Sequence, residues 1–292
     1  MMLKNFGQME QFVREQSGKK RVALAAAHDA DALGSLMMAV DRGIAEAILI
    51  GRRKEIVRVL DEMGKDAGDF RIIEEEDDRA AADKAVELVH CGEADMPMKG
   101  LMHTSTFMKA ILDKEKGLKE DGNLLSQASV FEIPEKDRFL IISDCAVNID
   151  PDLETKIKIT ENAAALAHTL GIEQPKIAVL SAVEVVNPKI RSTVDAAAMR
   201  ERLSDRYLID GPLALDNAID EAAAHHKGIE SPVAGNADIL IVPDLWSGNI
   251  FSKGLVFFAH LRSAGTLNGL KAPVVMSSRT DTVENKYLSI LT

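Results

Sequence analysis

The stretch VALAAAHDADALGSLMMAVDRGIAEAILIG, Val22–Gly51, decides the fold class of this 292-residue chain. It begins with an apolar run at residues 22–27, which predicts a buried strand. A polar turn at His28–Asp31 follows, and a helical pattern then continues to about Arg42. A second apolar run, Ala47–Ile50, predicts another strand. A strand, a helix and a second strand in this order are typical of a parallel β-sheet covered by helices.

Short apolar runs alternate with longer amphipathic segments along the rest of the chain. Further strands are expected at residues 71–73, 128–132, 139–143, 176–180, 237–242 and 273–276. Further helices are expected over residues 54–63, 77–90, 106–115, 153–170, 194–203 and 282–291. Residues 96–123 break this rhythm and are expected to begin as a loop containing Pro97 and Gly100. The change to a hairpin-like region near residue 128 is the expected boundary between two lobes.

The charge of the chain argues against nucleic acid as its main partner. Its formal net charge is −11, whereas binding to a phosphate backbone needs a basic surface. Small anionic ligands need only a few local donors and are not excluded. Two cysteines, a polar N-terminal segment without a signal-peptide pattern and no apolar run of about 20 residues predict a cytoplasmic protein that does not cross a membrane.

The first candidate site is Ser277–Thr280, which lies between an apolar strand and a helix. In open α/β sheets, ligands bind beyond the carboxyl ends of the strands, where a helix N-terminus offers free N–H donors. The hydroxyl of Ser278 and the guanidinium of Arg279 would add donors for a phosphate or an oxyanion. The alternative is that Ser278 or Thr280 only caps the following helix and that Arg279 lies on the surface.

A second candidate is the segment Lys99–Lys109, KGLMHTSTFMK. A glycine, a run of hydroxyls and a helix that carries Lys109 one turn in suit an anion at a helix N-terminus. His103 is a candidate acid–base group, but it has no carboxylate partner in the pattern. A plain Ser or Thr helix cap is the alternative interpretation.

Other strand ends also carry polar groups. Ser181 and Asn187 follow a strand and are candidate phosphate ligands, or parts of an ordinary loop. After a later strand, Gly248 permits close approach of a ligand and Lys253 adds a positive charge, so Gly248, Asn249 and Lys253 are candidate ligand-binding residues. The residues Asp210–Pro212 are expected to form a sharp turn in which the proline opens a helix.

Several motifs with well-defined chemistry are absent from the sequence. It contains no GxxxxGK[ST] phosphate loop, no GxGxxG after the first strand, no CxxC, no HExxH and no GxSxG. His225 and His226 are adjacent, so on a helix they point apart and make a poor metal pair. The sequence therefore argues against P-loop enzymes, zinc hydrolases and serine hydrolases.

Taken in order, six segments resemble the phosphate acetyl/butyryltransferase family, most closely its phosphate butyryltransferase branch. They are AHDADALGSLMMAVDRGIAEAILIG, KGLMHTSTFMKAILDKEKGL, VLSAVEVVNPKIRSTVDAAAM, DGPLALDNAI, ADILIVPDLWSGNIFSKGL and APVVMSSRTDTVENKYLSI. The resemblance covers essentially the whole chain. DGPLALDNAI and the C-terminal segment with its Ser-Arg pair are the most specific of the six.

The resemblance implies a two-lobed α/β/α fold with mainly parallel sheets, like that of isocitrate and isopropylmalate dehydrogenases. Residues 1–128 and 275–292 would form one lobe and residues 129–274 the other, with the active-site cleft between them. The implied reaction is acyl-CoA + phosphate = acyl phosphate + CoA (coenzyme A), with no cofactor beyond CoA as a substrate, no metal and no covalent acyl-enzyme. With CoA as a substrate, Gly248, Asn249 and Lys253 become candidate CoA-binding residues. A homodimer or higher homo-oligomer is also implied.

Carried onto this sequence, the family's Ser-Arg pair falls on Ser278 and Arg279, which would hold phosphate and stabilise the oxyanion. The hydroxyl-rich turn falls on His103, Thr104 and Thr106, where phosphate would bind. Two positions depart from the acetyltransferases. Lys109 replaces an arginine and so keeps the charge without the bidentate fork. Asn285 replaces an aspartate proposed as the base for the CoA thiol, and Asp281 and Glu284 are neighbouring carboxylates that could assist.

Three other functions compete with butyryl transfer. Phosphate acetyltransferase activity belongs to the same reaction class, and residue chemistry does not set the acyl chain length. A dehydrogenase or decarboxylase of the same fold would need a divalent metal held by clustered aspartates, and the sequence offers no convincing set. A non-catalytic CoA-binding or regulatory protein would bind CoA without releasing thiol from acyl-CoA.

Overall fold

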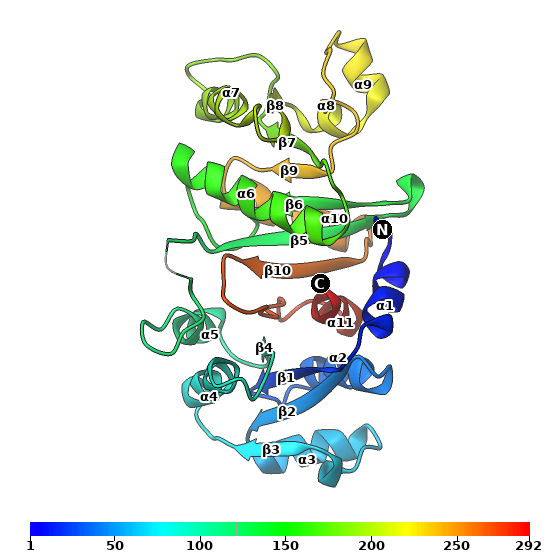
Figure 1. The fold of residues 1–292 in the computed structure, drawn as a ribbon, viewed down its shortest axis with the longest axis vertical. Coiled ribbons are helices and arrows are strands. Elements are labelled where there is room, and N and C mark those ends of the chain that lie inside the picture. The colour runs from blue at the N-terminus through cyan, green and yellow to red at the C-terminus, as the bar shows by residue number, and fades with distance from the viewer. Residues whose placement is uncertain (121) are drawn as a thin grey trace. The chain divides into compact units, whose positions relative to one another are not determined.

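The computed structural model describes residues 1–120 and 122–292 and divides into two compact units (Figure 1). The β1–β4 unit comprises Gly7–Asn123 and Ala264–Thr292, and the β5–β9 unit comprises Met1–Phe6 and Leu124–Ser263. The sequence placed the lobe boundaries after residues 128 and 274, whereas the units meet after residues 123 and 263. The first six residues also belong to the β5–β9 unit.

The β1–β4 unit is built on a parallel sheet with the strand order β3-β2-β1-β4 (Figure 1). Its strands are β1 (Lys20–Ala25), β2 (Ala45–Gly51), β3 (Arg71–Glu74) and β4 (Met96–Lys99). Its helices are α1 (Phe6–Glu15), α2 (Ala30–Asp41), α3 (Arg53–Glu62), α4 (Asp78–His90), α5 (Thr104–Ile111) and α11 (Val283–Leu291), with a 3₁₀ turn at Ala67–Asp69. The chain steps outward from β1 to β3 and then returns to place β4 on the other side of β1. Right-handed crossovers therefore put α2 and α3 on one face and α4 on the other.

Packing in this unit relies on small and aliphatic residues. The apolar ends of β1 and β2 are buried on both faces, as expected for strands covered by helices on either side. Helix α2 turns Ala32, Leu33 and Leu36 into the core, and α11 packs against α2. Helix α4 is capped by Asp77, whose carboxylate accepts the N–H of Ala80 at 2.8 Å. These elements hold the carboxyl ends of the strands at one edge of the sheet.

The strands of the β5–β9 unit run in the order β5-β6-β9-β7-β8. They are β5 (Ser126–Ile133), β6 (Arg138–Ser143), β7 (Lys176–Leu180), β8 (Leu208–Leu213) and β9 (Ile239–Ile241). Strands β5 and β6 pair antiparallel and are joined through a 3₁₀ turn at Pro134–Lys136, whereas β6 with β9, β9 with β7 and β7 with β8 pair parallel. The helices are α6 (Leu153–Thr169), α7 (Arg191–Leu203), α8 (Leu215–Ile219), α9 (Glu221–His226) and α10 (Leu245–Phe257), and β10 (Ser263–Asn268) leads the chain out of the unit. The expected α/β fold with mainly parallel sheets is confirmed.

One local expectation was wrong at Pro97, because residues 96–99 form β4 rather than a loop. Proline lacks an N–H and is usually excluded from the inside of a sheet. Here β4 pairs with β1 along its length, whereas on its other side the ladder is a single parallel bridge between Met98 and Val275. The carbonyl of Pro97 accepts the N–H of Val275 at 3.0 Å, so the missing N–H faces the side where pairing only begins. This bridge is also all that forms of the strand expected at residues 273–276.

The segment Asp210–Pro212 was also interpreted wrongly, because it lies inside β8 rather than opening a helix. The Gly211–Pro212 peptide bond is cis. Strand β8 is the last strand of its sheet, and an edge strand tolerates a proline because one row of its N–H groups needs no ladder partner. The helix of the motif begins only at Leu215.

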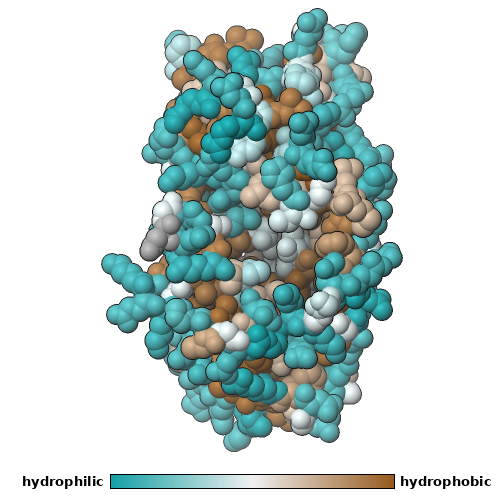
Figure 2. All heavy atoms as spheres, in the orientation of Figure 1, coloured by the Kyte–Doolittle hydropathy of each residue, from teal (hydrophilic) through white to brown (hydrophobic). Residues whose placement is uncertain are grey.

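Hydrophilic side chains cover most of the face seen in Figure 2, which agrees with a chain that is 28% charged. Among the described residues, no helix combines the length and the apolar character needed to cross a membrane.

Gly100, directly after β4, lies where the backbone leaves no room for a side chain. A Cβ atom there would be 2.3 Å from the carbonyl oxygen of Ala26 and 2.6 Å from that of Ala25. We expect Gly100→Ala to cost about 1–3 kcal/mol of unfolding free energy in urea denaturation, because backbone must shift to accept the methyl group. The control is Gly34→Ala in α2, whose Cβ would meet Met63 at an ordinary 3.5 Å. It should be neutral or stabilising, and equal losses in the two variants would contradict the close approach at Gly100.

Candidate active site

The carboxyl edge of the β1–β4 sheet brings together residues from three distant parts of the chain. Lys99, the last residue of β4, is in register with Ala25, the last residue of β1. The segment that leads to Ser278 and Arg279 joins this edge through the parallel bridge between Met98 and Val275. Because β2 and β4 pair with opposite sides of β1, the gap between the ends of β1 and β4 is a topological switch point of the sheet. Ligands of open α/β proteins bind at such points.

Ser278 and Arg279 lie in a tight turn that precedes α11. The N–H of Ser278 donates to the carboxylate of Asp281 at 2.6 Å, and the hydroxyls of Ser278 and Thr280 lie 3.0 Å apart. The helix cap is Thr282, whose hydroxyl accepts the N–H of Asn285 at 3.1 Å. The alternative in which Ser278 or Thr280 caps the helix is therefore wrong. Arg279 is exposed and forms no ion pair within the described part of the chain.

Lys99 is the most unusual charged residue at this edge. Its side chain is buried, with 3% of the residue exposed, and its Nζ donates one long hydrogen bond of 3.3 Å to the carbonyl of Gly100. Burial lowers the pKa of Lys99, and the positive charge of Arg279 lowers it further. Asp29 and Asp281 act in the opposite direction, while Lys286 lowers the pKa again. The positive charges of these neighbours and the loss of water together disfavour the charged amine.

Lys286, in the first turns of α11, is a second buried lysine at this edge. It is 2% exposed, and its Nζ donates to the backbone carbonyl of Asp281. Lys99, Lys286 and Arg279 thus place three positive charges near the N-terminus of α11, whose helix dipole adds further positive potential. We call this group the cationic cluster. Of these three, sequence reasoning assigned a role only to Arg279; Lys99 was named as the first residue of a candidate segment, and its burial was not predicted.

His28, which follows β1, is a further polar residue that sequence reasoning did not select. It is 7% exposed, and its Nε2 lies 2.8 Å from a guanidinium nitrogen of Arg52. A guanidinium can only donate, so Nε2 accepts and the ring proton is assigned to Nδ1. The Nδ1 atom is buried without a partner among the described residues. Burial lowers the pKa of His28, and the charge of Arg52 lowers it further.

The hydroxyl-rich turn predicted as a phosphate site begins α5, directly after β4. His103 precedes the helix and Thr104 is its first residue. Both are exposed, as is Lys109, whereas Thr106 is partly buried. Within the described residues, none of these four side chains forms a hydrogen bond or ion pair. Lys109 lies five residues beyond Thr104, which is about 7.5 Å along the helix axis. The turn therefore stands at the sheet edge, while Lys109 lies further along the helix.

In the β5–β9 unit, Ser181 and Asn187 lie on the loop that follows β7. The hydroxyls of Ser181 and Ser192 are 2.8 Å apart. The side-chain oxygen of Asn187 accepts the N–H of Lys189 at 3.0 Å, and its backbone N–H donates to the hydroxyl of Thr193 at 2.9 Å. These contacts stabilise the loop, as expected if Ser181 and Asn187 are parts of an ordinary loop.

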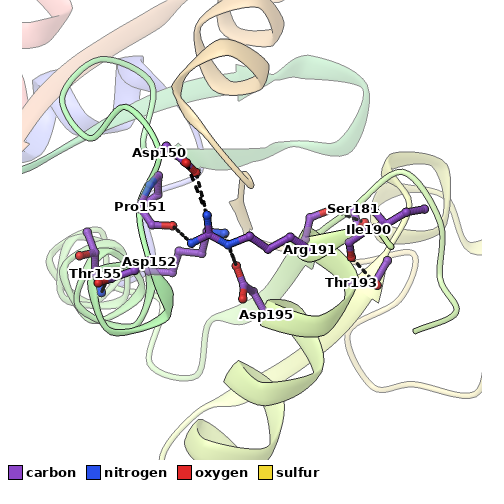
Figure 3. Close-up of polar contacts among 11 residues, drawn as sticks. Asp150, Pro151, Asp152, Thr155, Ser181, Ile190, Arg191, Thr193 and Asp195 are labelled. Atoms are coloured by element: carbon purple, nitrogen blue, oxygen red, sulfur yellow. Dashed lines mark hydrogen bonds and ion pairs between the residues drawn. The ribbon is translucent and has the colours of Figure 1, made fainter. Parts of the chain in front are cut away.

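An ion-pair cluster that the sequence did not reveal secures the start of α7 (Figure 3). The guanidinium of Arg191 lies 3.2 Å from Asp150 and 3.4 Å from Asp195, and it also donates to the carbonyl of Pro151 at 3.3 Å. Asp195 in turn accepts from Lys156 of α6 at 2.6 Å. Lys156 is 3% exposed, so this pair ties α6 to α7 from within the core. The cluster positions the loop that carries Ser181 and Asn187.

The residues predicted to bind CoA all lie on α10. A Cβ on Gly248 would be 2.4 Å from the carbonyl oxygen of Asp144, so the close approach that glycine permits is made by the protein's own backbone. The side-chain amide of Asn249 donates to the carbonyl of Cys145 at 3.2 Å. Lys253 is exposed one turn later and forms no ion pair in the described part of the chain.

No group of three or more His, Cys, Asp or Glu side chains in the described ranges is arranged to hold a metal ion.

The two units have mainly parallel sheets, and one carries a cationic cluster at its strand ends. These features define an α/β protein suited to bind a small anion. Comparison with known proteins identifies the family. The family model described as phosphate acetyl/butaryl transferase matches residues 78–292. The chain is 46% identical to phosphate butyryltransferase of Clostridium acetobutylicum over 294 aligned positions, which cover 99% of this chain and 97% of the relative.

Solved structures give the same result. A branched-chain phosphotransacylase from Enterococcus faecalis matches with a TM-score of 0.83 and 35% identity, over 93% of this chain and 96% of that one. A 4-hydroxythreonine-4-phosphate dehydrogenase from Klebsiella pneumoniae shares the fold alone, with a TM-score of 0.56 and 13% identity over 94% and 98% of the two chains. The chain belongs to the phosphate acetyl/butaryl transferase family, and the resemblance inferred from its sequence is confirmed.

The ion pair between Lys156 and Asp195 leads to one prediction. Asp195→Asn should lower the unfolding free energy by about 3–5 kcal/mol, because it leaves the buried charge of Lys156 without its partner. The control is Asp150→Asn, which removes the exposed partner of Arg191 and should cost less than about 1 kcal/mol. Urea denaturation of both variants measures the difference. Similar losses in the two would show that burial does not set the strength of these pairs.

The lowered pKa of Lys99 generates a second prediction, with the opposite sign. Lys99→Met removes a buried charge that the ligand-free protein does not pair, so it should raise the unfolding free energy at pH 7 by roughly 1–3 kcal/mol. In the wild type, the charged amine costs stability below its lowered pKa, and the cost disappears as the pH rises towards the unfolded value of about 10.4.

Denaturation in phosphate-free buffer at several pH values tests this. The stability gap between Lys99→Met and the wild type should be larger at pH 7 than at pH 10, because the cost of the charged amine fades as the pH approaches the unfolded pKa. A variant that is less stable than the wild type at pH 7, or a gap that widens with pH, would contradict it.

Proposed function

We propose that this protein transfers an acyl group between CoA and inorganic phosphate: acyl-CoA + phosphate = acyl phosphate + CoA. Membership of the family and full-length similarity to a phosphate butyryltransferase support this proposal. The observation that supports a location for this activity is the Ser278–Arg279 turn at the carboxyl edge of the β1–β4 sheet. The helix cap is Thr282, so neither residue is consumed by capping α11 and both stand beside further positive charges.

The mechanism we propose is direct transfer in a ternary complex. A phosphate oxygen attacks the thioester carbonyl, the carbon–sulfur bond breaks, and CoA leaves as the thiolate. Arg279 binds the phosphate and polarises the carbonyl, and Ser278 donates to the oxyanion that develops. Positioning of two bound anions would supply much of the remaining rate enhancement. Of the two cysteines, Cys145 is buried, and burial raises its pKa to about 12, so it is a poor candidate for an acyl-carrying nucleophile.

Asn285 cannot act as a base, and acyl phosphate formation does not demand one at this position. The leaving thiolate has an ordinary thiol pKa of about 8.5, so it departs near neutral pH with modest electrostatic help. The nearby positive charges of the cationic cluster are suited to give that help. For the reverse reaction, the carboxylates of Asp281 and Glu284 stay candidates for assisting the thiol.

The remaining site assignments stay predictions that follow from this function. Phosphate would be held by His103, Thr104, Thr106, Lys109, Ser181 and Asn187, and CoA by Gly248, Asn249 and Lys253. The active-site cleft expected between the lobes is likewise a prediction. A structure with CoA and phosphate or sulfate bound would test these assignments together.

The acyl group is butyryl or another short chain in this proposal, and acetyl is the main alternative. One methylene is worth only about 1–3 kcal/mol in an apolar pocket, so rates with acetyl-, butyryl- and longer acyl-CoA must decide. The second candidate function is a non-catalytic CoA-binding or regulatory protein, which would bind CoA in calorimetry without releasing thiol from any acyl-CoA.

We further propose a cytoplasmic homodimer or higher homo-oligomer that needs no cofactor besides the CoA substrate. Exposed apolar side chains on and just after α10 support self-association, because large apolar side chains that gather on a surface often mark an interface. Trp246 is 59% exposed, Ile250 71% and Phe258 89%.

The test is to mix butyryl-CoA with phosphate and follow the release of free thiol. Arg279→Ala should lower the rate at least about a hundredfold, because it removes a donor that stabilises the transition state. The control is Arg58→Ala on α3, an exposed arginine of the same unit that pairs with Glu62. It should keep the wild-type rate. An Arg279→Ala variant as active as the wild type would sink the assignment of this site.

A further inference from the structure

Two lysines in this protein are buried to the same degree but are paired very differently. Lys99 and Lys156 are each 3% exposed. Lys156 has a carboxylate of Asp195 at 2.6 Å. Lys99 has no carboxylate oxygen within 4 Å in the described part of the chain, and its one hydrogen bond is 3.3 Å long. An ammonium group removed from water without a partner is costly, and buried lysines are normally paired.

The surroundings of Lys99 add positive charge rather than cancel it. Arg279 and Lys286 are close enough to lower its pKa, and Lys286 uses its own amine to bind the carbonyl of Asp281. The opposing carboxylates, Asp29 and Asp281, accept backbone N–H groups of Asp31 and Ser278. The ligand-free edge thus holds three cations against two carboxylates that are already hydrogen-bonded. The net charge of these five groups is positive, so a small anionic ligand would offset it.

The position of Lys99 matches such a ligand. It ends β4 at the topological switch point, between the end of β1 and the turn that carries Arg279. The next residue, Gly100, lies against the backbone of β1 and has no side chain, so it does not cover the end of β4. An ammonium group has three donors and works as a point charge, so it accepts a tetrahedral anion in several orientations.

We propose that Lys99 is a phosphate-binding residue, which donates from Nζ to inorganic phosphate, or to the phosphoryl group of the acyl phosphate, alongside Arg279. Its role in turnover rests on the proposed acyltransferase function, whereas its role in binding phosphate does not. Lys99 binds those phosphate oxygens that do not attack the thioester. Arg279 binds the phosphate too and also contacts the thioester carbonyl. The bound dianion then supplies the counter-charge that Lys156 receives from Asp195.

The experiment measures binding of inorganic phosphate to the full chain by titration calorimetry, and then the steady-state kinetics of thiol release. The variants are Lys99→Met, Lys99→Arg and the control Lys20→Met, which removes an exposed lysine at the opposite end of the same sheet. Lys99→Met should raise the Kd for phosphate at least about tenfold, because it removes a hydrogen bond between charged groups. The KM for phosphate should rise with it, while the KM for butyryl-CoA stays within about twofold.

Lys99→Arg should restore phosphate binding to a Kd below that of Lys99→Met, because it restores the charge, and Lys20→Met should bind like the wild type. Lys99→Met should also fold at least as stably as the wild type in phosphate-free buffer. A Lys99→Met protein that fails to fold would show a structural role and would overturn the proposal. So would a phosphate Kd for that variant within threefold of the wild type.

These outcomes separate the two proposals. A wild type that binds phosphate through Lys99 but releases no thiol would refute the acyltransferase function and leave the phosphate site standing. A wild type that turns over normally, with a Lys99→Met variant of unchanged phosphate affinity, would refute the site and leave the function standing.

Discussion

The parallel pairing of β4 with β1 is the constraint on which the candidate site depends. Parallel strands end at the same edge, so this pairing brings Lys99 beside the turn that follows β1. The single bridge from Met98 to Val275 then adds the segment that ends in Ser278 and Arg279. Gly100 makes the arrangement sterically feasible, because the chain leaves β4 against the carbonyl of Ala26. Backbone geometry alone therefore gathers side chains that lie about 180 residues apart.

The electrostatics of the two units follow opposite rules. In the β5–β9 unit, Lys156, Asp195 and Arg191 satisfy one another, and the result is a fixed connection between α6 and α7. At the edge of the β1–β4 sheet, like charges are held near each other and near a helix N-terminus, and the folded chain carries that cost itself. Concentrated charge of one sign is what an anion site needs, since it is then preorganised before the ligand arrives. The ion pairs of Lys156, Asp195 and Arg191 thus contribute to stability, whereas the cationic cluster is suited to binding an anion.

The sequence predicted those parts of the fold that local patterns encode. The apolar runs of β1 and β2 and the helical period of α4 are sufficient by themselves. The strand MPMK was missed because its proline and lysine contradict strand composition, and only the pairing with β1 explains it. For the candidate site, Ser278 and Arg279 were proposed from their place between a strand and a helix and then from family resemblance, but Thr282 was not predicted as the helix cap. Lys99 and the pair of Lys156 with Asp195 depend on burial and on contacts between distant residues, which no local pattern contains.

The discontinuous course of the β1–β4 unit has a consequence for biosynthesis. Its last segment, Ala264–Thr292, contributes both α11 and Val275, yet the ribosome makes it only after the whole stretch Leu124–Ser263. At about 5–20 residues per second, the 140 residues of that stretch take roughly 7–28 s to translate. During this interval the nascent sheet lacks the helix that packs on α2, so its apolar surface is exposed to chaperones and to other nascent chains. The β5–β9 unit, by contrast, is continuous apart from its first six residues, and can complete its fold first.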